Sequence, residues 1–206
     1  TEALFVTAFA GILDLDSGDL VYCNAGHDAP YCVGAASGLR RLVAGECVQR
    51  ARHRGIGEDS RLDSELVAQT GQLRLDGLVV DSFLQPAWRP LKQLVDNMGP
   101  APVKLLINTH WHFDHTDNNE NFRKVGAAIL SHANTKKRMS QTHDLLGMHF
   151  TPSSPRALPT QTFVDKHTQR MNGERVEAGR IPPAHTDTDA YVHFTRVNAL
   201  HMGDVY

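Results

Sequence analysis

The sequence lacks the features that mark several whole classes of protein. It has three cysteines, Cys23, Cys32 and Cys47, an odd number confined to the first quarter of the chain. A disulfide framework is therefore not expected, and a reducing cytoplasm is the expected compartment. No apolar run approaches the roughly 20 residues that a membrane-spanning helix needs, and no signal peptide opens the chain. The sequence thus predicts neither a secreted disulfide scaffold nor a membrane protein.

An excess of either charge is also absent. Among 206 residues, 41% are hydrophobic and 21% are charged, and the formal net charge is −2. Nucleic acids and anionic membranes are bound by basic surfaces, so neither is expected as a partner. The length suffices for one well-cored domain with or without an appendage. Because the chain begins with Thr1 rather than Met, it reads as a piece of a longer gene.

Histidine, by contrast, is abundant, with twelve in the chain. Three of them lie in the stretch "NTHWHFDHTDNN", directly after an apolar run that predicts a buried strand. In an extended segment alternate side chains share a face, so His110 and His112 can point at one metal ion. Asp114 and His115 follow where the chain turns and can face a second ion. Solvated histidines in a polar loop are the alternative, but this spacing favours metal ligands.

Two further candidate ligands lie next to predicted strands downstream. His185, in "PPAHTDTDAYV", comes just before one strand, and Asp204, in "LHMGDVY", comes just after another. A carboxylate that follows Met-Gly at a strand end is well placed to bridge two cations. With the histidine loop, these residues form an ordered set of ligands.

The chain divides into dissimilar parts. Residues 4–33 alternate in polarity around Asp16-Ser17-Gly18, which predicts a β-hairpin. Residues 46–71 are polar and charge-mixed, and we expect a linker there with one short helix after Ser60. From Gln72 strands and helices alternate. The expected elements are a buried strand at "LVVDS", an amphipathic helix at "WRPLKQLVDNM", a buried strand at "VKLLINT", a helix over 133–146, a hairpin turning at Asn172-Gly173, and strands at "AYVHF" and "NALHMG".

The motifs "THWHFDHTDNN", "PAHTDTDA" and "LHMGDVY" resemble the metal-binding motifs of the metallo-β-lactamase-fold hydrolases, and "GLVVDS" resembles that family's early strand ending in Asp81. The resemblance covers residues 72–206. It implies an α/β fold, an αββα sandwich with the site at one edge of the sheets. It also implies two divalent metal ions, zinc by preference and manganese or iron as alternatives. The implied ligands are His110, His112 and His185 for the first ion, Asp114 and His115 for the second, and Asp204 as the bridge.

This sequence departs from the family pattern at its end. Family members continue past the Gly-Asp motif to a last histidine ligand, whereas this chain stops at Tyr206, so we expect a truncated sandwich. His132, which follows a predicted strand, is the first choice as a substitute, and His27 could come from a partner subunit. A homodimer with exchanged elements is expected, because a shortened sandwich must cover its apolar surface. The remaining possible substitutes are His53, His143, His149, His193 and His201.

The front segment "FVTAFAGILDLDSGDLVYCNAGHDAPYCV" resembles the internal strands of metal-dependent serine/threonine phosphatases of bacterial stress-response and sporulation pathways. The resemblance covers residues 1–43 and includes none of that family's metal-binding aspartate motifs. We therefore expect a structural fragment without phosphatase chemistry. The whole chain reads as a chimera of a hairpin fragment (1–45), a linker (46–71) and a truncated metallo-β-lactamase-like domain (72–206).

The predicted function is that of a promiscuous, dinuclear-metal-dependent hydrolase of small ester-type substrates. Two metals in an open site would turn bound water into a hydroxide nucleophile, and Asp114 could orient it or accept its proton. Phosphoesters, that is phosphodiesters and phosphotriesters, are favoured, since two cations can clamp the two non-bridging oxygens that a diester offers. The alternatives are a β-lactam or lactone hydrolase and, from another class, a catalytically dead metal-binding interaction module.

Overall fold

The computed structural model describes residues 76–97, 101–145, 147–196 and 198–205, apart from the side chains of Leu94 and Asn97, and the backbone of five earlier strands. These strands are β1 (Ala8–Leu13), β2 (Asp19–Ala25), β3 (Tyr31–Gly34), β4 (Gly38–Arg41) and β5 (Gln49–Arg52).

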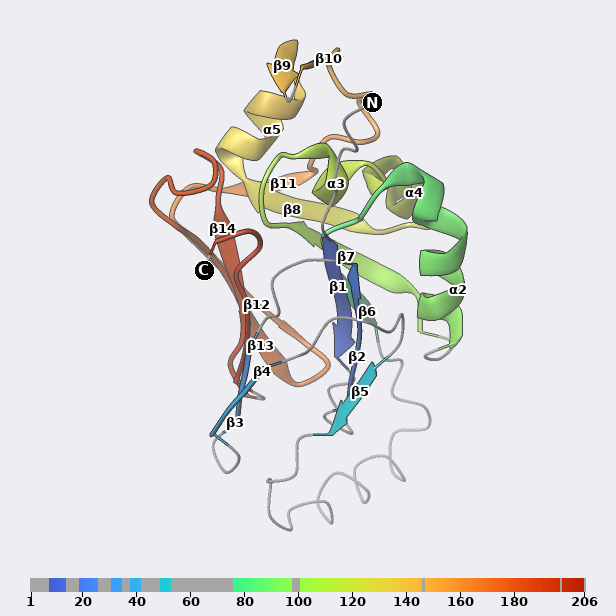
Figure 1. Cartoon of the computed structure of the whole chain (residues 1–206), viewed down its shortest axis with the longest axis vertical. Helices are drawn as coiled ribbons and strands as arrows, with labels where there is room; N and C mark the ends of the chain where they lie inside the picture. The colour runs from blue at the N-terminus through green and yellow to red at the C-terminus, as the bar shows by residue number, and fades with distance from the viewer. Residues whose placement is uncertain are drawn as a thin grey trace.

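The front strands form two small sheets. β1 and β2 pair antiparallel with Leu13 opposite Leu20, so the predicted hairpin is present, although its turn lies outside the described residues. β5 pairs with β2, and the segment expected to be a linker therefore contains a paired strand. β3 pairs with β4, and β1 lies near β6 (Figure 1). The helix expected after Ser60 lies outside the described residues. So do His27 and His53.

A four-stranded parallel sheet forms the centre of the fold, in the order β11-β8-β7-β6. All four of its strands contribute buried apolar side chains, and β6, β7 and β8 do so on both faces, as strands buried on both sides of a parallel sheet must. Their bounds are β6 (Gly77–Val80), β7 (Val103–Asn108), β8 (Ala128–His132) and β11 (Gln161–Phe163).

Helices cover the outer face of this sheet. The 3-10 turn η1 (Gln85–Ala87) leads into α2 (Trp88–Asn97), and α3 (Phe113–Thr116) and α4 (Asn119–Lys124) follow β7. Phe122 of α4 is fully buried against the sheet residues Leu106 and Ile129, and Trp88 meets it edge to face. The amphipathic helix predicted at "WRPLKQLVDNM" is confirmed.

The second sheet is antiparallel, in the order β12-β13-β14-β15. The turn between its first two strands has Asn172 at φ 51° and Gly173 at φ 76°, the geometry that an Asn-Gly hairpin favours. The hairpin predicted there is confirmed, as are the two strands after it. Their bounds are β12 (Lys166–Met171), β13 (Glu174–Arg180), β14 (Ala190–Phe194) and β15 (Ala199–His201).

The two sheets pack face to face, with the helices on the far side of the parallel sheet (Figure 1). Their shared core joins Leu105, Ile107 and Leu130 of the parallel sheet to Val176 and Val192 of the antiparallel one. The mixed α/β sandwich expected from the sequence is therefore present. No helix among the described residues is long and apolar enough to span a membrane.

One predicted element was wrong. The helix expected over 133–146 ends early: α5 spans Ala133–Met139, and β9 (His143–Leu145) and β10 (Met148–Phe150) then form an antiparallel hairpin. The Ser140 hydroxyl donates to the carbonyl of Lys136 and closes the last turn. Gly147, at φ 74°, supplies the left-handed residue that the hairpin turn uses.

Candidate metal centre

The centre is built first on the loop that leaves the carboxyl end of β7. His110 is 1% exposed and lies two residues after the end of β7, and His112 has extended backbone as the N-cap of α3. Asp114 lies in the first turn of α3, and His115 is buried one residue further on. Extended backbone thus sets the directions of the His110 and His112 side chains. The first turn of α3 sets those of Asp114 and His115.

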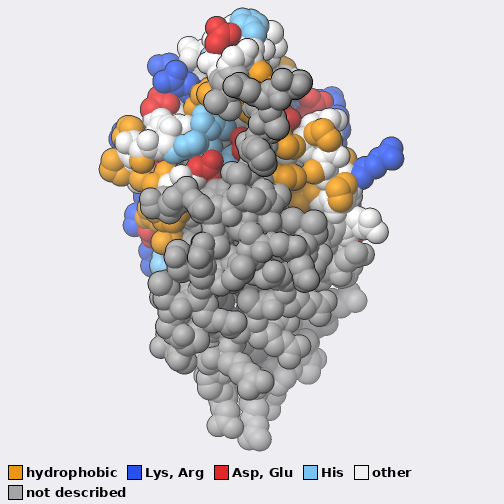
Figure 2. Space-filling view, in the orientation of Figure 1, with side chains coloured by type: hydrophobic (Ala, Val, Ile, Leu, Met, Phe, Trp, Pro, Cys, Tyr) orange, Lys and Arg blue, Asp and Glu red, His pale blue; other side chains and the backbone are white. Residues whose placement is uncertain are grey.

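The first ligand group joins this loop to the antiparallel sheet. His185 lies between β13 and β14, and its Nε2 is 2.9 Å from Nδ1 of His112. Ligand nitrogens of His110, His112 and His185 all lie within 4.8 Å of one another. Figure 2 shows histidine side chains gathered at the surface next to acidic ones.

The second group shares His110 and adds His115 and Asp204. His115 Nε2 is 3.2 Å from Asp204 Oδ1 and 3.6 Å from Asp114 Oδ2. The other oxygen of Asp204 is 3.4 Å from His185 Nε2. Asp204 therefore lies between the two groups, where the sequence placed a bridging carboxylate.

These donors fit divalent cations. The Nε2 atom of His110 is buried yet makes no hydrogen bond among the described residues. A buried polar atom without a partner is costly unless an ion completes its environment. Imidazoles and carboxylates that converge in this way are the ligands that zinc and related metals take.

The charge state of the histidines differs across the centre. Burial, reinforced by neighbouring histidines, lowers the pKa of His110 well below its ordinary value. Burial and the adjacent His185 lower the pKa of His112 to about 4. Burial alone would lower the pKa of His115, but the carboxylates of Asp81 and Asp204 outweigh it, and that pKa is raised. The first two rings are therefore neutral, with lone pairs ready for a cation.

Asp81, at the end of β6, orients two of the ligands. Its carboxylate lies 2.8 Å from His115 Nδ1 and accepts from the backbone N–H of Thr109 at 2.8 Å and its hydroxyl at 2.7 Å. The Thr109 hydroxyl is also 3.0 Å from Nδ1 of His110. When Nδ1 carries the proton, Nε2 of each ring is left for a metal, the usual arrangement around histidine ligands.

Asp189 plays the corresponding part for the other loop, and the sequence analysis did not identify it. This buried carboxylate accepts from the backbone N–H groups of Ala184 at 3.2 Å, His185 at 2.9 Å and Thr186 at 2.8 Å. The hydroxyl of Thr188 accepts from the backbone N–H of Trp111 at 3.1 Å and so joins the two loops. The Thr- and Asp-rich run "HTDTD" was the available signal, because these side chains bind nearby backbone groups.

Three buried asparagines support the histidine loop and were also missed. Asn118 donates to the carbonyls of Ser82 at 2.9 Å and Leu84 at 2.7 Å. Asn108 donates to the carbonyl of His115 at 3.1 Å and exchanges hydrogen bonds with Asn119. Buried amides of this kind need every hydrogen-bonding group satisfied, and here they hold the loop to β7 and to the segment that follows β6.

Gly203 allows the last ligand to approach. Its φ is +60°, and a Cβ there would lie 2.8 Å from Oγ1 and 2.9 Å from Cβ of Thr109. Only glycine fits both this conformation and this contact, so Asp204 is brought against the histidine loop.

The structure does not place His132 in the centre, contrary to expectation. Its Nδ1 accepts from the backbone N–H of Asn134 at 3.2 Å, as the N-cap of α5, and its ring packs against Phe163. Local capping chemistry thus accounts for its position. His143, His149, His193 and His201 belong to neither ligand group.

Residues 76–205 match the profile of the Metallo-beta-lactamase superfamily. Several solved structures are similar to this chain, each at a TM-score of 0.50. MEM-A1, a subclass B3 metallo-beta-lactamase from a soil metagenome library, is 19% identical, over 63% of this chain and 52% of that one. The MIM-2 metallo-beta-lactamase is 17% identical, over 60% and 48%. A metallo-beta-lactamase from Cronobacter sakazakii is 15% identical, over 59% and 45%. This chain spans about half the length of these proteins, and at these identities the likeness concerns the fold alone.

Proposed function

Because the chain belongs to the metallo-β-lactamase superfamily, whose members are metal-dependent hydrolases, we propose that it is a hydrolase with two divalent cations in the centre described above. The observation that carries the proposal is the pair of ligand groups that share His110, with Asp204 between them. When bound, two divalent cations supply an activated water nucleophile and polarise the bond to be cleaved.

The candidate ligands form two sets, one for each cation. His110, His112 and His185 would hold one cation, and His115, Asp114 and Asp204 the other. Zinc suits these donors, and manganese and iron are alternatives.

Asp114 is the candidate proton acceptor. Burial raises the pKa of its carboxyl group, which favours proton uptake, although the neighbouring His115 opposes this effect. Its Oδ2 faces the same space as Nε2 of His115, at 3.6 Å. A carboxylate so placed can orient a nucleophilic water and take its proton.

Phosphodiesters and phosphotriesters are the proposed substrates. A diester offers two non-bridging oxygens, which can face the two ligand groups at once. β-Lactam or lactone hydrolysis is the second candidate, since the similar solved structures are named metallo-beta-lactamases. A metal-binding interaction module without activity is the third.

One experiment separates these possibilities. The purified protein is assayed for bound metal and then for turnover of a chromogenic phosphodiester, a phosphotriester, an aryl ester, a lactone and a cephalosporin. We expect about two metal ions per chain and the highest turnover on the phosphoesters, abolished by chelation. Full metal content without turnover of any substrate would indicate a metal-binding interaction module. A preference for the cephalosporin would indicate a β-lactam hydrolase.

The homodimer with exchanged elements stays a prediction. Light scattering at micromolar concentration tests it, since a mass near the 22.8 kDa of one chain would contradict it.

A further inference from the structure

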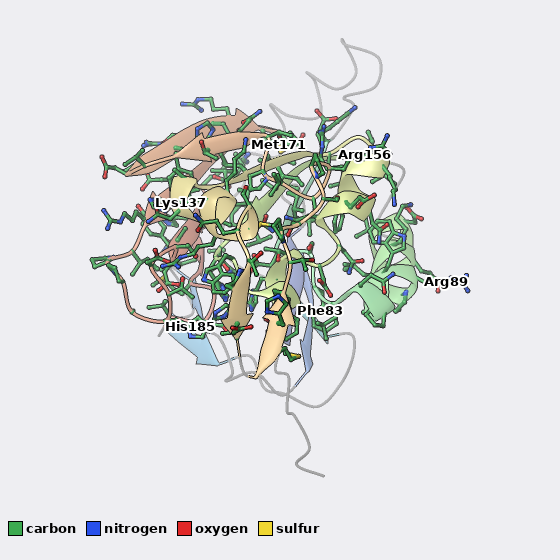
Figure 3. All side chains as sticks on the ribbon, turned by 90° about the horizontal axis from the view of Figure 1, so that it is seen from above. Phe83, Arg89, Lys137, Arg156, Met171 and His185 are labelled. Carbon is green, nitrogen blue, oxygen red and sulfur yellow. The ribbon has the colours of Figure 1, made fainter. Side chains whose placement is uncertain are left out.

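A pocket of about 200 Å³ lies beside the metal centre. Its walls come from the histidine loop and α3, the end of α5, the β9–β10 hairpin and the segment that follows it. Figure 3 looks down on this end of the molecule and shows the hairpin in front, between the labelled His185 and Phe83. The volume is below the roughly 300 Å³ at which pockets begin to hold drug-sized ligands, so it suits one chemical group of a substrate.

One side of the pocket is aromatic. His143 meets Trp111 edge to face at 4.2 Å between ring centroids and stacks on Phe150 at 5.4 Å. Phe150 stacks in turn on Phe113 at 5.4 Å. Four rings from the loop and the hairpin thus form a continuous wall, which suits a flat ligand group.

The pocket and the metal centre share a residue. Trp111 lies between His110 and His112 in sequence, and its ring centroid is 4.9 Å from that of His112. The indole that lines the pocket therefore also touches a candidate ligand. A substrate held at the centre can place a neighbouring group against this indole.

The charge of the pocket is negative. Asp117 and Glu120 line it, and among the described residues that line the pocket none is Lys or Arg. Lys124 lies 3.2 Å from the Glu120 carboxylate and offsets part of that charge. Burial raises the pKa of the Asp117 carboxyl group, and the hydrogen bond that it accepts from the backbone N–H of Gln85 at 3.4 Å opposes this effect. An anionic group is disfavoured here, whereas a cationic one gains from both the carboxylates and the rings.

We propose that this pocket binds an aromatic group of the substrate, one that is uncharged or positively charged. The inference rests on the proposed function and narrows the substrate class to esters that carry such a group beside the bond to be cleaved.

Direct binding tests the pocket without any turnover. The chain has two tryptophans, so Trp88→Phe leaves Trp111 as the sole tryptophan, whose emission can be followed with excitation that tyrosine does not absorb. Titration with phenyltrimethylammonium should change this fluorescence saturably. Phe150→Ala should weaken binding at least about tenfold, and Asp117→Asn, which keeps an acceptor for Gln85, about threefold to tenfold. His149→Ala is the matched control, because His149 lies on the same hairpin but outside the pocket. Absence of saturable binding, or equal loss in the His149 and Phe150 variants, would overturn the proposal.

Kinetics then tests the substrate class. Four p-nitrophenyl phosphodiesters differ only in the second group: ethyl, benzyl, 4-trimethylammoniobenzyl and 4-carboxybenzyl. We expect the KM for the carboxylate to exceed that for the ammonium compound by about tenfold, and Asp117→Asn to narrow this ratio. Probe binding without turnover would support the pocket while the proposed function fails. Turnover with equal KM values throughout would support the proposed function and refute the pocket.

Discussion

The two regions that supply the metal ligands are built differently. The loop after β7 is part of the core: the side chains of His110 and His115 are 1% and 4% exposed, and Asp81 beneath them is buried. The ligands of the antiparallel sheet lie nearer the surface, with the side chains of His185 35% and Asp204 18% exposed. One half of the centre is therefore held by burial, and the other half by hydrogen bonds within surface loops.

Each region depends on one buried carboxylate. Asp81 binds the side chains of His115 and Thr109, so it connects β6 to the histidine loop across the sheet. Asp189 binds mainly backbone N–H groups within its own loop. Substitution of Asp81 should therefore lower both the stability of the fold and the affinity for metal, whereas substitution of Asp189 should lower chiefly the affinity for metal.

The largest effect is expected from the loss of a metal ligand in either region. His112→Ala removes a ligand of the first region and Asp204→Ala one of the second. Loss of a residue that supports a ligand typically lowers activity by up to roughly 100-fold, and each of these variants should lower turnover by more than that. The circular dichroism spectrum should stay unchanged, which would show that the variant is folded. Chelation of the parental protein should have the same effect. Near-parental turnover in either purified variant would refute the dinuclear centre.

The variants Asp81→Asn and Asp189→Asn test whether the two ligand regions are held in place differently. The first should lower the free energy of unfolding by about 3–5 kcal/mol, because it breaks a buried charged pair. The second should lower it by about 1–2 kcal/mol and weaken metal binding about 10–100-fold. Urea unfolding and metal titration measure both, with Asp165→Asn at an exposed site as the control. Equal losses of stability would show that the two regions are held alike.

The contact between the regions is tested by Gly203→Ala. A methyl group there meets Thr109, and the positive φ adds strain, so we expect a loss of about 1–3 kcal/mol and lower turnover. Gly126→Ala has the same sign of φ, +98°, but no atom within 4 Å of the new Cβ. This control should lose stability without losing turnover. Similar turnover in the two variants would mean that the close approach does not position Asp204.

The smallest effect concerns the tether between α5 and the His185 loop. Arg138 donates to Asp187 at 2.9–3.0 Å, and these hydrogen bonds lower the pKa of that carboxyl group. The pair is largely exposed, so Arg138→Met should lower the free energy of unfolding by only about 0.5–1 kcal/mol, with Lys137→Met as the control.

The pH dependence of this tether follows from the sign of the shift. A pKa depressed by folding stabilises the protein above the unfolded value of about 4 and loses that effect as the pH falls through the folded value. Urea unfolding of the metal-free protein should therefore show a difference in the free energy of unfolding between Arg138→Met and its parent at pH 7, and this difference should be lost at acid pH as the Asp187 carboxyl group takes up its proton. A difference that persists there would point to packing of the arginine stem instead.

Several features of the site could be predicted because they depend on short-range geometry. The Asn172-Gly173 turn, the apolar run of β7 and the helix at Trp88 follow from local residue preferences. The hairpin at β9–β10 was missed because "SQTHDLL" contains no proline or glycine that would mark the end of a helix. His132 was misplaced because the hydrogen bond that its Nδ1 accepts from the backbone N–H of Asn134 becomes evident only once the helix start is known.

The sequence by itself determined which residues could meet a metal within one segment, because the spacing of His110, His112, Asp114 and His115 along a strand end sets their directions. Only the tertiary structure decided how Asp189 and the three asparagines support these ligands. It also decided that four aromatic rings and two carboxylates form a pocket at Trp111. These contacts join residues from several elements. They depend on how two sheets and their helices pack, and local residue preference does not contain that information.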